Sequence, residues 1–372
     1  MQKRVNNKLK LLLTGGHAGA TAYAVIQEIR MERKPWELYW VGSRTVLEGK
    51  NIDTLEHKTF PQIGVKVYSL SSGRLQRKFT IWTLISYFKI PFGFIEAFKL
   101  ISNIKPNCIL SFGGYTSFPV VVISYFAGIP IISHDQTAAA GRANIYSSFF
   151  STKIAISRES SRKYFPEKKV ILTGNPVEPE ILQVKTKNDI GNPPTILITG
   201  GHSGSVTINN AIEKIISKLL RDFIVIHQCG DFQFNKFVSI KKSLKSNLRQ
   251  RYFVYGTISH WNWPKVLSGC DLIISRAGAN IVSQIMAIKR PSILIPIPFA
   301  YLDEQRKNAE IAKNFGIARI IEQDDLNETI LLGEVKDVKA KWKSMVLATR
   351  NKNSPDRNAA KNIVSLVEKF LP

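Results

Sequence analysis

Short apolar runs alternate along the chain with stretches whose apolar residues recur at helical spacing. The stretch after Thr199 shows the helical pattern, with Ile208, Ile212, Ile215 and Leu219 on one face. The short runs are nearly continuous and end in glycine or polar residues, which is typical of parallel strands covered by helices on both faces. The pattern therefore predicts an α/β fold. The predicted strands are Leu11–Thr14, Asn107–Ser111, Pro130–Ser133, Ile154–Ser157, Val170–Thr173, Thr195–Thr199, Phe223–His227, Tyr252–Tyr255, Asp271–Ser275, Ser292–Pro296 and Ala318–Ile321.

The pattern lapses once, in a polar stretch that contains Pro and Gly and ends KTKNDIGNPP. We predict a linker at 184–194, between an N-terminal lobe at 1–183 and a C-terminal lobe at 195–372. Each lobe opens with a similar segment, LLLTGGHAGA and ILITGGHSGS, in which a strand leads through a Gly-Gly-His turn into a helix. The predicted architecture is two doubly wound, Rossmann-like lobes that face a central cleft, with the final helix free to pack back on the first lobe.

Glycine-rich turns between strands and helices are candidate phosphate sites. They present backbone N–H groups at the positive end of a helix dipole, and glycine lets a phosphate approach the backbone. Two more such turns are Ser111–Pro119 and Ser275–Asn280. None has the P-loop pattern, and none has the G-x-G-x-x-G spacing of a dinucleotide fold. A purely geometric role for the glycines is the alternative for each turn.

The chain carries 52 Lys and Arg against 28 Asp and Glu, a net charge of +24. Such an excess favours nucleic acid, an anionic membrane or phosphorylated substrates as partners, although much of it fits an ordinary solvated surface. Nucleic acid is not expected, because aromatic-rich basic motifs of the RNP type are absent. Three scattered cysteines argue against a disulfide framework and a zinc site. The sequence shows neither a signal peptide nor a membrane span, so we expect a cytoplasmic protein that is soluble or held at a membrane surface.

One segment, 74–105, combines basic and aromatic residues against a single acidic one. Because Lys89 and Pro91 interrupt its apolar run, it is expected to lie on a bilayer rather than cross it. The alternative is a core helix with exposed lysines. The predicted membrane-docking residues are Arg74, Arg77, Lys78, Trp82, Phe88 and Lys89.

An ordered set of motifs from about residue 10 to residue 325 resembles the MurG glycosyltransferases, with GGYTSFP, TGNPV and SRAGA the most specific. These are UDP-N-acetylglucosamine:undecaprenyl-pyrophosphoryl-muramoyl-pentapeptide N-acetylglucosaminyltransferases of glycosyltransferase family 28. The resemblance implies a GT-B fold and an inverting transfer without a required metal or cofactor. It also implies work at the cytoplasmic face of the cell membrane during peptidoglycan synthesis. The absence of any D-x-D triplet agrees with the expectation of no metal.

The resemblance also implies which residues bind the two substrates. The UDP-sugar donor would be held by His17, Ala18, Gly19, Thr137, His202, Ser203, Gly204, Ala279, Asn280, Ile281, Val282, Ser283, Gln284 and Gln305. The acceptor, linked to undecaprenyl pyrophosphate, would be held by Gly15, Gly16, Gly113, Gly114 and Tyr115.

A histidine is the expected general base, because its pKa suits proton transfer at neutral pH. Of the six histidines, only two follow strands of the N-terminal lobe. We predict His17 as the base and a required role for His134, with Asp135 as its partner.

Five positions depart from the usual family pattern: Ala20, Thr137, Glu178, His202 and Gln284. Gln284 stands where a glutamate normally holds the donor ribose, and an amide makes a weaker hydrogen bond to a hydroxyl than a carboxylate does. Two alternatives therefore stay open. One is a related GT-B transferase with a different nucleotide sugar or lipid acceptor. The other is an inactive basic module that binds membrane or nucleic acid.

Overall fold

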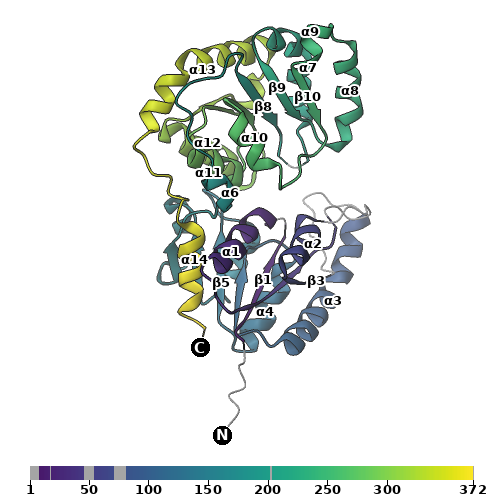
Figure 1. The fold of residues 1–372 in the computed structure, drawn as a ribbon. Helices are drawn as coiled ribbons and strands as arrows, with labels where there is room; N and C mark the ends of the chain where they lie inside the picture. Colours follow the sequence, from purple (N-terminus) through teal and green to yellow (C-terminus); the bar gives the residue numbers. More distant parts are fainter. Residues whose placement is uncertain (1–7, 17, 46–53, 71–80, 202, 372) are drawn as a thin grey trace. The chain divides into compact units, whose positions relative to one another are not determined.

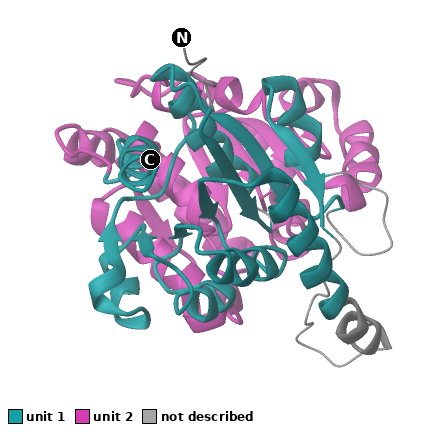
Figure 2. Ribbon diagram, turned by 90° about the horizontal axis from the view of Figure 1, so that it is seen from below, with its two compact units in different colours: residues 1–178, 355–372 teal, residues 179–354 magenta. Residues whose placement is uncertain are grey.

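The computed structural model describes residues 8–16, 18–45, 54–70, 81–201 and 203–371, with side chains left out for 81–89. The chain forms two compact units (Figures 1 and 2). Unit 1 comprises Met1–Glu178 and Pro355–Pro372, and unit 2 comprises Pro179–Ser354. The first crossing between the units therefore follows Glu178, a few residues before the stretch predicted as a linker.

Within the described residues, unit 1 is built on a seven-stranded parallel sheet in the order β3-β2-β1-β4-β5-β6-β7. Its strands are β1 (Lys10–Gly15), β2 (Glu37–Gly42), β3 (Lys66–Ser69), β4 (Cys108–Ser111), β5 (Ile131–Asp135), β6 (Lys153–Ile156) and β7 (Val170–Leu172). Its helices are α1 (Gly19–Met31), α2 (Leu55–Thr59), α3 (Ile81–Ile104), α4 (Ser117–Phe126), α5 (Arg142–Ser147) and α14 (Ala359–Glu368).

Alternate residues of β1 enter two different cores. Leu11 and Leu13 pack with side chains of α1 and α14, whereas Leu12 packs with side chains of α3 and α4. This two-sided burial explains why the strand is continuously apolar. All eleven predicted strands are present, and the α/β fold class is confirmed. The sequence analysis missed β2 and β3.

A buried ion pair holds the C-terminal segment within unit 1. The Arg158 guanidinium donates to both carboxylate oxygens of Asp356, at 2.5 and 2.6 Å. Asp356 also accepts a hydrogen bond from the Asn175 backbone N–H, at 2.8 Å. Asp356 is fully buried, and Arg158 compensates its charge inside the unit. This ion pair anchors the chain just before α14 begins at Ala359.

Unit 2 is built, within its described residues, on a six-stranded parallel sheet in the order β10-β9-β8-β11-β12-β13. Its strands are β8 (Thr195–Thr199), β9 (Ile224–Gln228), β10 (Tyr252–Tyr255), β11 (Leu272–Ser275), β12 (Ser292–Leu294) and β13 (Ala318–Ile320). Its helices are α6 (Pro179–Leu182), α7 (Val206–Asp222), α8 (Phe234–Ser243), α9 (Ser246–Arg249), α10 (Trp263–Gly269), α11 (Ala279–Ile288), α12 (Glu304–Phe315) and α13 (Glu328–Thr349).

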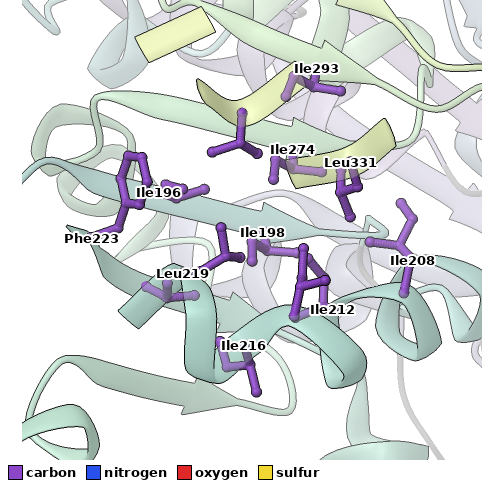
Figure 3. Close-up of a cluster of buried hydrophobic side chains, with 14 of the residues drawn as sticks. Ile196, Ile198, Ile208, Ile212, Ile216, Leu219, Phe223, Ile274, Ile293 and Leu331 are labelled. Atoms are coloured by element: carbon purple, nitrogen blue, oxygen red, sulfur yellow. The ribbon is translucent and has the colours of Figure 1, made fainter. Parts of the chain in front are cut away.

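The core of unit 2 confirms the helical spacing expected after Thr199. Figure 3 shows Ile208, Ile212 and Leu219 of α7 turned toward Ile196 and Ile198 of β8. Each of these side chains is nearly or fully buried. Because α7 and β8 share one continuous core, the position of the turn between them is fixed.

Candidate active site

Two glycine turns at the carboxyl ends of β1 and β4 lie against each other in unit 1. The Gly16 N–H donates to the Gly113 carbonyl oxygen at 2.8 Å, and Thr116 Oγ1 donates to the Gly15 carbonyl oxygen at 3.1 Å. Gly114 has φ +94°, and a Cβ there would lie 2.7 Å from the Gly16 nitrogen. The structure thus brings the predicted acceptor-binding glycines together, with Tyr115 half-buried beside them.

His134 lies in the core of unit 1 rather than at its surface. It is 1% exposed, and its Nε2 lies 3.2 Å from the Gly174 carbonyl oxygen and 3.2 Å from Ser157 Oγ. Burial lowers its pKa to about 4, so the imidazole is neutral at pH 7. This environment suits a group that positions its neighbours.

Asp135 organises the loop that follows β5. Its carboxylate accepts hydrogen bonds from Thr137 N–H and Oγ1, both at 3.2 Å, from Gly141 N–H at 2.9 Å and from Asn144 Nδ2 at 2.8 Å. Burial raises its pKa, and these hydrogen bonds oppose that shift. Thr137, a predicted donor contact, is therefore tied to Asp135.

Asn144 is a member of this cluster that the sequence analysis did not single out. Its Nδ2 also donates to the His134 carbonyl oxygen at 3.1 Å. Its Oδ1 lies only 2.3 Å from where a Cβ on Gly113 would be, which requires glycine at that position. The only sequence signal was its place in the GRAN motif.

The first glycine turn leads into α1. His17 lies outside the described residues, whereas Ala18 and Gly19 are buried. The backbone N–H groups of Ala18 and Gly19 interact with the carboxylate of Glu56, which the sequence analysis also missed. These two predicted donor contacts therefore face a group of the chain itself.

In unit 2 the corresponding turn joins β8 to α7. Ser205 caps α7, because its Oγ accepts a hydrogen bond from the Ile208 N–H at 3.4 Å. Gly204 has φ +74°, and a Cβ there would lie 2.2 Å from the Cys229 carbonyl oxygen. Ser203 is exposed, and His202 lies outside the described residues.

Arg276, directly after β11, is a buried cation whose hydrogen-bond partners in the described part of the chain are all neutral. Its Nε donates to Ser205 Oγ at 3.0 Å, its Nη1 to the Ile295 and Pro296 carbonyl oxygens at 3.2 and 3.4 Å, and its Nη2 to Gln323 Oε1 at 2.8 Å. Among the described residues no carboxylate forms a salt bridge with it. Arg276 is 8% exposed, and burial lowers its pKa.

The N-terminus of α11 lies three residues after Arg276. Its first residues, Ala279, Asn280 and Ile281, are half-buried, and no side chain caps the helix. The positive ends of α7 and α11 and the Arg276 charge therefore occur at the same edge of the unit 2 sheet. This arrangement is suited to an anion, and a diphosphate is the anion that such turns commonly hold.

The remaining predicted donor residues lie on α11 and α12. Val282, Ser283 and Gln284 are buried, and Gln284 Oε1 accepts a hydrogen bond from Trp263 Nε1 at 3.0 Å. Gln305 Oε1 accepts a hydrogen bond from the Ile297 N–H at 3.2 Å, which holds the chain after β12.

The comparisons with known proteins cover nearly the whole chain. Residues 50–156 match the glycosyltransferase family 28 N-terminal domain, and residues 195–367 match the family 28 C-terminal domain. A Clostridium tetani protein is 30% identical over 371 residues, with 98% of each chain covered; it is named UDP-N-acetylglucosamine--N-acetylmuramyl-(pentapeptide) pyrophosphoryl-undecaprenol N-acetylglucosamine transferase. This chain belongs to glycosyltransferase family 28. The predicted family and enzyme class are thereby confirmed.

Further matches to known proteins support this assignment. A Clostridium perfringens protein of the same name is 31% identical, with 97% of this chain and 98% of that protein covered. The Acinetobacter baumannii MurG crystal structure matches with a TM-score of 0.70 at 23% identity and covers 97% of this chain and 99% of its own. That structural match bears on the fold, and the predicted GT-B fold is confirmed.

The other described histidines of the family 28 chain have structural partners. His227 is buried between Tyr252 and Asn209, at 2.8 and 3.0 Å, and burial lowers its pKa to about 3. His57 lies 3.1 Å from Thr54 Oγ1. Burial also lowers the pKa of His260.

Among the described residues, no three His, Cys, Asp or Glu side chains gather as metal ligands would.

A group of aromatic and aliphatic side chains is exposed on unit 1. Phe92, Ile95 and Phe98 on α3, Phe126 at the end of α4 and Phe149 after α5 are between 52% and 77% exposed. We call these five residues the apolar patch. Half-buried Phe118 and Phe150 of the same unit pack edge to face, with ring centroids 6.2 Å apart.

The predicted membrane-docking residues fall largely outside what the structure describes. Arg74, Arg77 and Lys78 lie outside the described residues. Trp82, Phe88 and Lys89 lie on α3, in the part whose side chains are left out. None of the described helices is both long and apolar enough to span a membrane.

Proposed function

We propose that this chain transfers N-acetylglucosamine from UDP-N-acetylglucosamine to a muramoyl-pentapeptide carried on undecaprenyl pyrophosphate. Full-length relatives that are 30–31% identical are named for this reaction. In the reaction the acceptor hydroxyl oxygen bonds to the anomeric carbon of the sugar while the bond from that carbon to UDP breaks. The hydroxyl proton passes to a base, and UDP leaves with the electron pair.

Arg276 is the observation that carries the donor half of this proposal. A buried cation costs free energy unless an anion compensates it, and the partners of Arg276 among the described residues are all neutral. A donor diphosphate held beside Ser205 and the N-terminus of α11 would supply the missing anion. Preorganised donors and helix dipoles would then stabilise the charge that develops on UDP as it leaves.

The donor contacts proposed in unit 2 follow from this placement. Ser203 and Gly204 would contact the diphosphate from the turn before α7, and Ala279, Asn280 and Ile281 from the start of α11. Gln284 and Gln305 would contact the nucleotide or the sugar.

The proposed acceptor half lies in unit 1. The paired turns at Gly15–Gly16 and Gly113–Tyr115 would hold the acceptor, and His17 would take its proton as general base. His134 and Asp135 would act as positioning residues, because both are buried and hydrogen-bonded.

A transfer assay tests the proposed reaction. The full chain is incubated in detergent micelles with the lipid-linked muramoyl-pentapeptide and, in separate reactions, UDP-N-acetylglucosamine, UDP-N-acetylgalactosamine and UDP-glucose. We expect acceptor-dependent UDP release and product only with UDP-N-acetylglucosamine. Transfer from another sugar would replace the donor, and no transfer from any of them would overturn the proposal.

Attachment to an anionic membrane surface, on the cytoplasmic side, is the second part of the proposal. The apolar patch is accompanied on α3 by exposed Lys99 and on the following turn by exposed Lys105. Aromatic side chains insert at the headgroup level, and each nearby lysine contributes about 1 kcal/mol at an anionic surface.

Co-sedimentation with vesicles tests this attachment. We expect binding to vesicles that contain phosphatidylglycerol, with less binding at high salt or after the double substitution Phe98→Ser and Phe126→Ser. Phe232→Ser, at an 89% exposed phenylalanine of unit 2, is the matched control and should bind normally. Equal binding of the double variant and the wild type would show that the apolar patch does not dock.

A further inference from the structure

Glu56 is a residue of α2 whose buried carboxylate lies against the start of α1. The residue is 4% exposed. A Cβ on Gly19 would lie 3.1 Å from Glu56 Cδ and 3.3 Å from Oε1, so the carboxylate sits directly against the first turn of α1. The backbone N–H groups of Ala18 and Gly19 interact with it there.

Among the residues that the structure describes, no side chain of the α1 segment itself caps the N-terminus of α1. Its N-cap residue, Ala18, offers no side-chain hydrogen bond, and the first turn carries no acidic residue. Unpaired N–H groups and the helix dipole favour an anion at this place. Glu56 supplies that anion from a separate element.

Burial and hydrogen bonding act on Glu56 in opposite directions. Burial is the larger effect and holds the pKa of Glu56 above its ordinary value, whereas its own N–H, the Thr54 hydroxyl and the N–H groups of Ala18 and Gly19 lower it. Among the described residues no cation forms a salt bridge with Glu56. The positive end of α1 is thus the compensating partner of this carboxylate.

A second anion could not share this place without repulsion. Two unit charges 4 Å apart repel by about 4 kcal/mol at an effective dielectric constant of 20. A substrate phosphate at the α1 N-terminus would therefore have to displace Glu56.

We propose that Glu56 is the resident anion at the N-terminus of α1, where it positions Ala18 and Gly19 and keeps substrate phosphates away from this helix end. This inference rests on the proposed function for its catalytic consequence only. The first glycine turn also packs on Gly113 and Gly114, so a shift at Ala18–Gly19 would reach the proposed acceptor site.

Kinetics test the positioning role. Glu56→Gln keeps the shape and removes the charge, and we expect kcat to fall at least tenfold while KM for UDP-N-acetylglucosamine changes less than twofold. Glu56→Ala should lose more activity and regain part of it with added formate or acetate, but not with chloride or acetamide at matched ionic strength. Glu167→Gln, at an exposed carboxylate of unit 1, is the control and should behave as wild type.

Amide hydrogen exchange tests the contact without any turnover. In the full chain, a peptide whose measured amides are those of residues 18–22 should exchange faster in Glu56→Ala than in the wild type, with Glu56→Gln between them. Inorganic pyrophosphate should protect this peptide in Glu56→Ala but not in the wild type.

The outcomes separate this inference from the proposed reaction. Unchanged exchange in both Glu56 variants, or pyrophosphate protection of the amides of residues 18–22 in the wild type, would overturn the resident-anion assignment. Normal kcat in both folded variants would overturn the positioning role. A wild type without transferase activity would refute the proposed function and leave the exchange result to decide this one.

Discussion

Replacing Arg276 by methionine should abolish most donor binding while leaving the fold in place. Methionine is similar in length and apolar, so it can fill the same space. The four neutral hydrogen-bond acceptors that Arg276 contacts lose a donor, but no carboxylate is left unpaired. Removal of an uncompensated buried charge offsets part of that loss. We expect the unfolding temperature without ligand to shift by no more than about 4 °C, the effect of about 1 kcal/mol in a unit of this size.

The expected loss of affinity follows from the distance at which a diphosphate would lie. Unit charges 4 to 6 Å apart attract by about 3–4 kcal/mol at an effective dielectric constant of 20. At about 1.4 kcal/mol for each factor of ten, this corresponds to a UDP dissociation constant raised roughly 100-fold or more. Arg276→Lys keeps the charge and loses the fork that reaches Ser205 and Gln323, so it should lose less affinity.

Calorimetric titration with UDP measures this effect, in the presence and absence of EDTA. Arg221→Met, at an exposed arginine of α7, is the matched control and should bind like the wild type. UDP binding by Arg276→Met within threefold of wild type would refute the diphosphate placement. If instead both Arg276 variants unfold, the residue is structural and the argument from uncompensated charge is wrong.

Four further outcomes are expected. His17→Ala should lower kcat by about 10²–10⁴-fold with UDP binding unchanged, and near-normal turnover would remove His17 as the base. The pKa of His134 is about 4 in the fold and 6.5 when unperturbed, so its contribution to stability is present above pH 6.5 and is lost as the pH falls toward 4. The unfolding temperature should therefore fall less between pH 6.5 and pH 4 in His134→Gln than in the wild type. An equal fall in the two proteins would contradict this. Gly114→Ala should lower acceptor turnover, because its Cβ would meet Gly16 at 2.7 Å, and normal kinetics would show that the two turns can separate at no cost. Asp356→Asn should cost about 3–5 kcal/mol, measured by denaturant unfolding, because it removes the carboxylate charge that compensates the buried Arg158 guanidinium, and a loss below 1 kcal/mol would show that water reaches the guanidinium.

Most of the strands predicted from sequence are apolar runs that the fold buries from both sides, although the predicted edge strands β7, β10 and β13 are partly exposed. Leu11–Leu13 and Ile196–Ile198 are fully buried and were recognisable for that reason. The edge strand β3 is mostly exposed, so its residues carry no such run. The missed strand β2 does contain Tyr39, Trp40 and Val41, residue types that favour strands, so its signal was present in the sequence.

The candidate site was predictable in position but not in electrostatics. Glycine turns at the ends of strands mark where ligands bind in an open α/β sheet, and the sequence showed them. The lack of a counter-ion at Arg276 depends on Ser205, Ile295 and Gln323, which come from separate parts of the chain. No local pattern relates these positions, so only the folded unit reveals the uncompensated charge.

The two Gly-Gly-His turns look alike in sequence and differ in charge once folded. In unit 1 the helix after the turn meets Glu56, a carboxylate of the same chain. In unit 2 the helix after the turn meets Arg276, whose partners are neutral. The first helix end is therefore compensated and the second is left positive. An anionic ligand is attracted to the uncompensated helix end. A single side chain that packs against each turn therefore gives the two similar turns different roles.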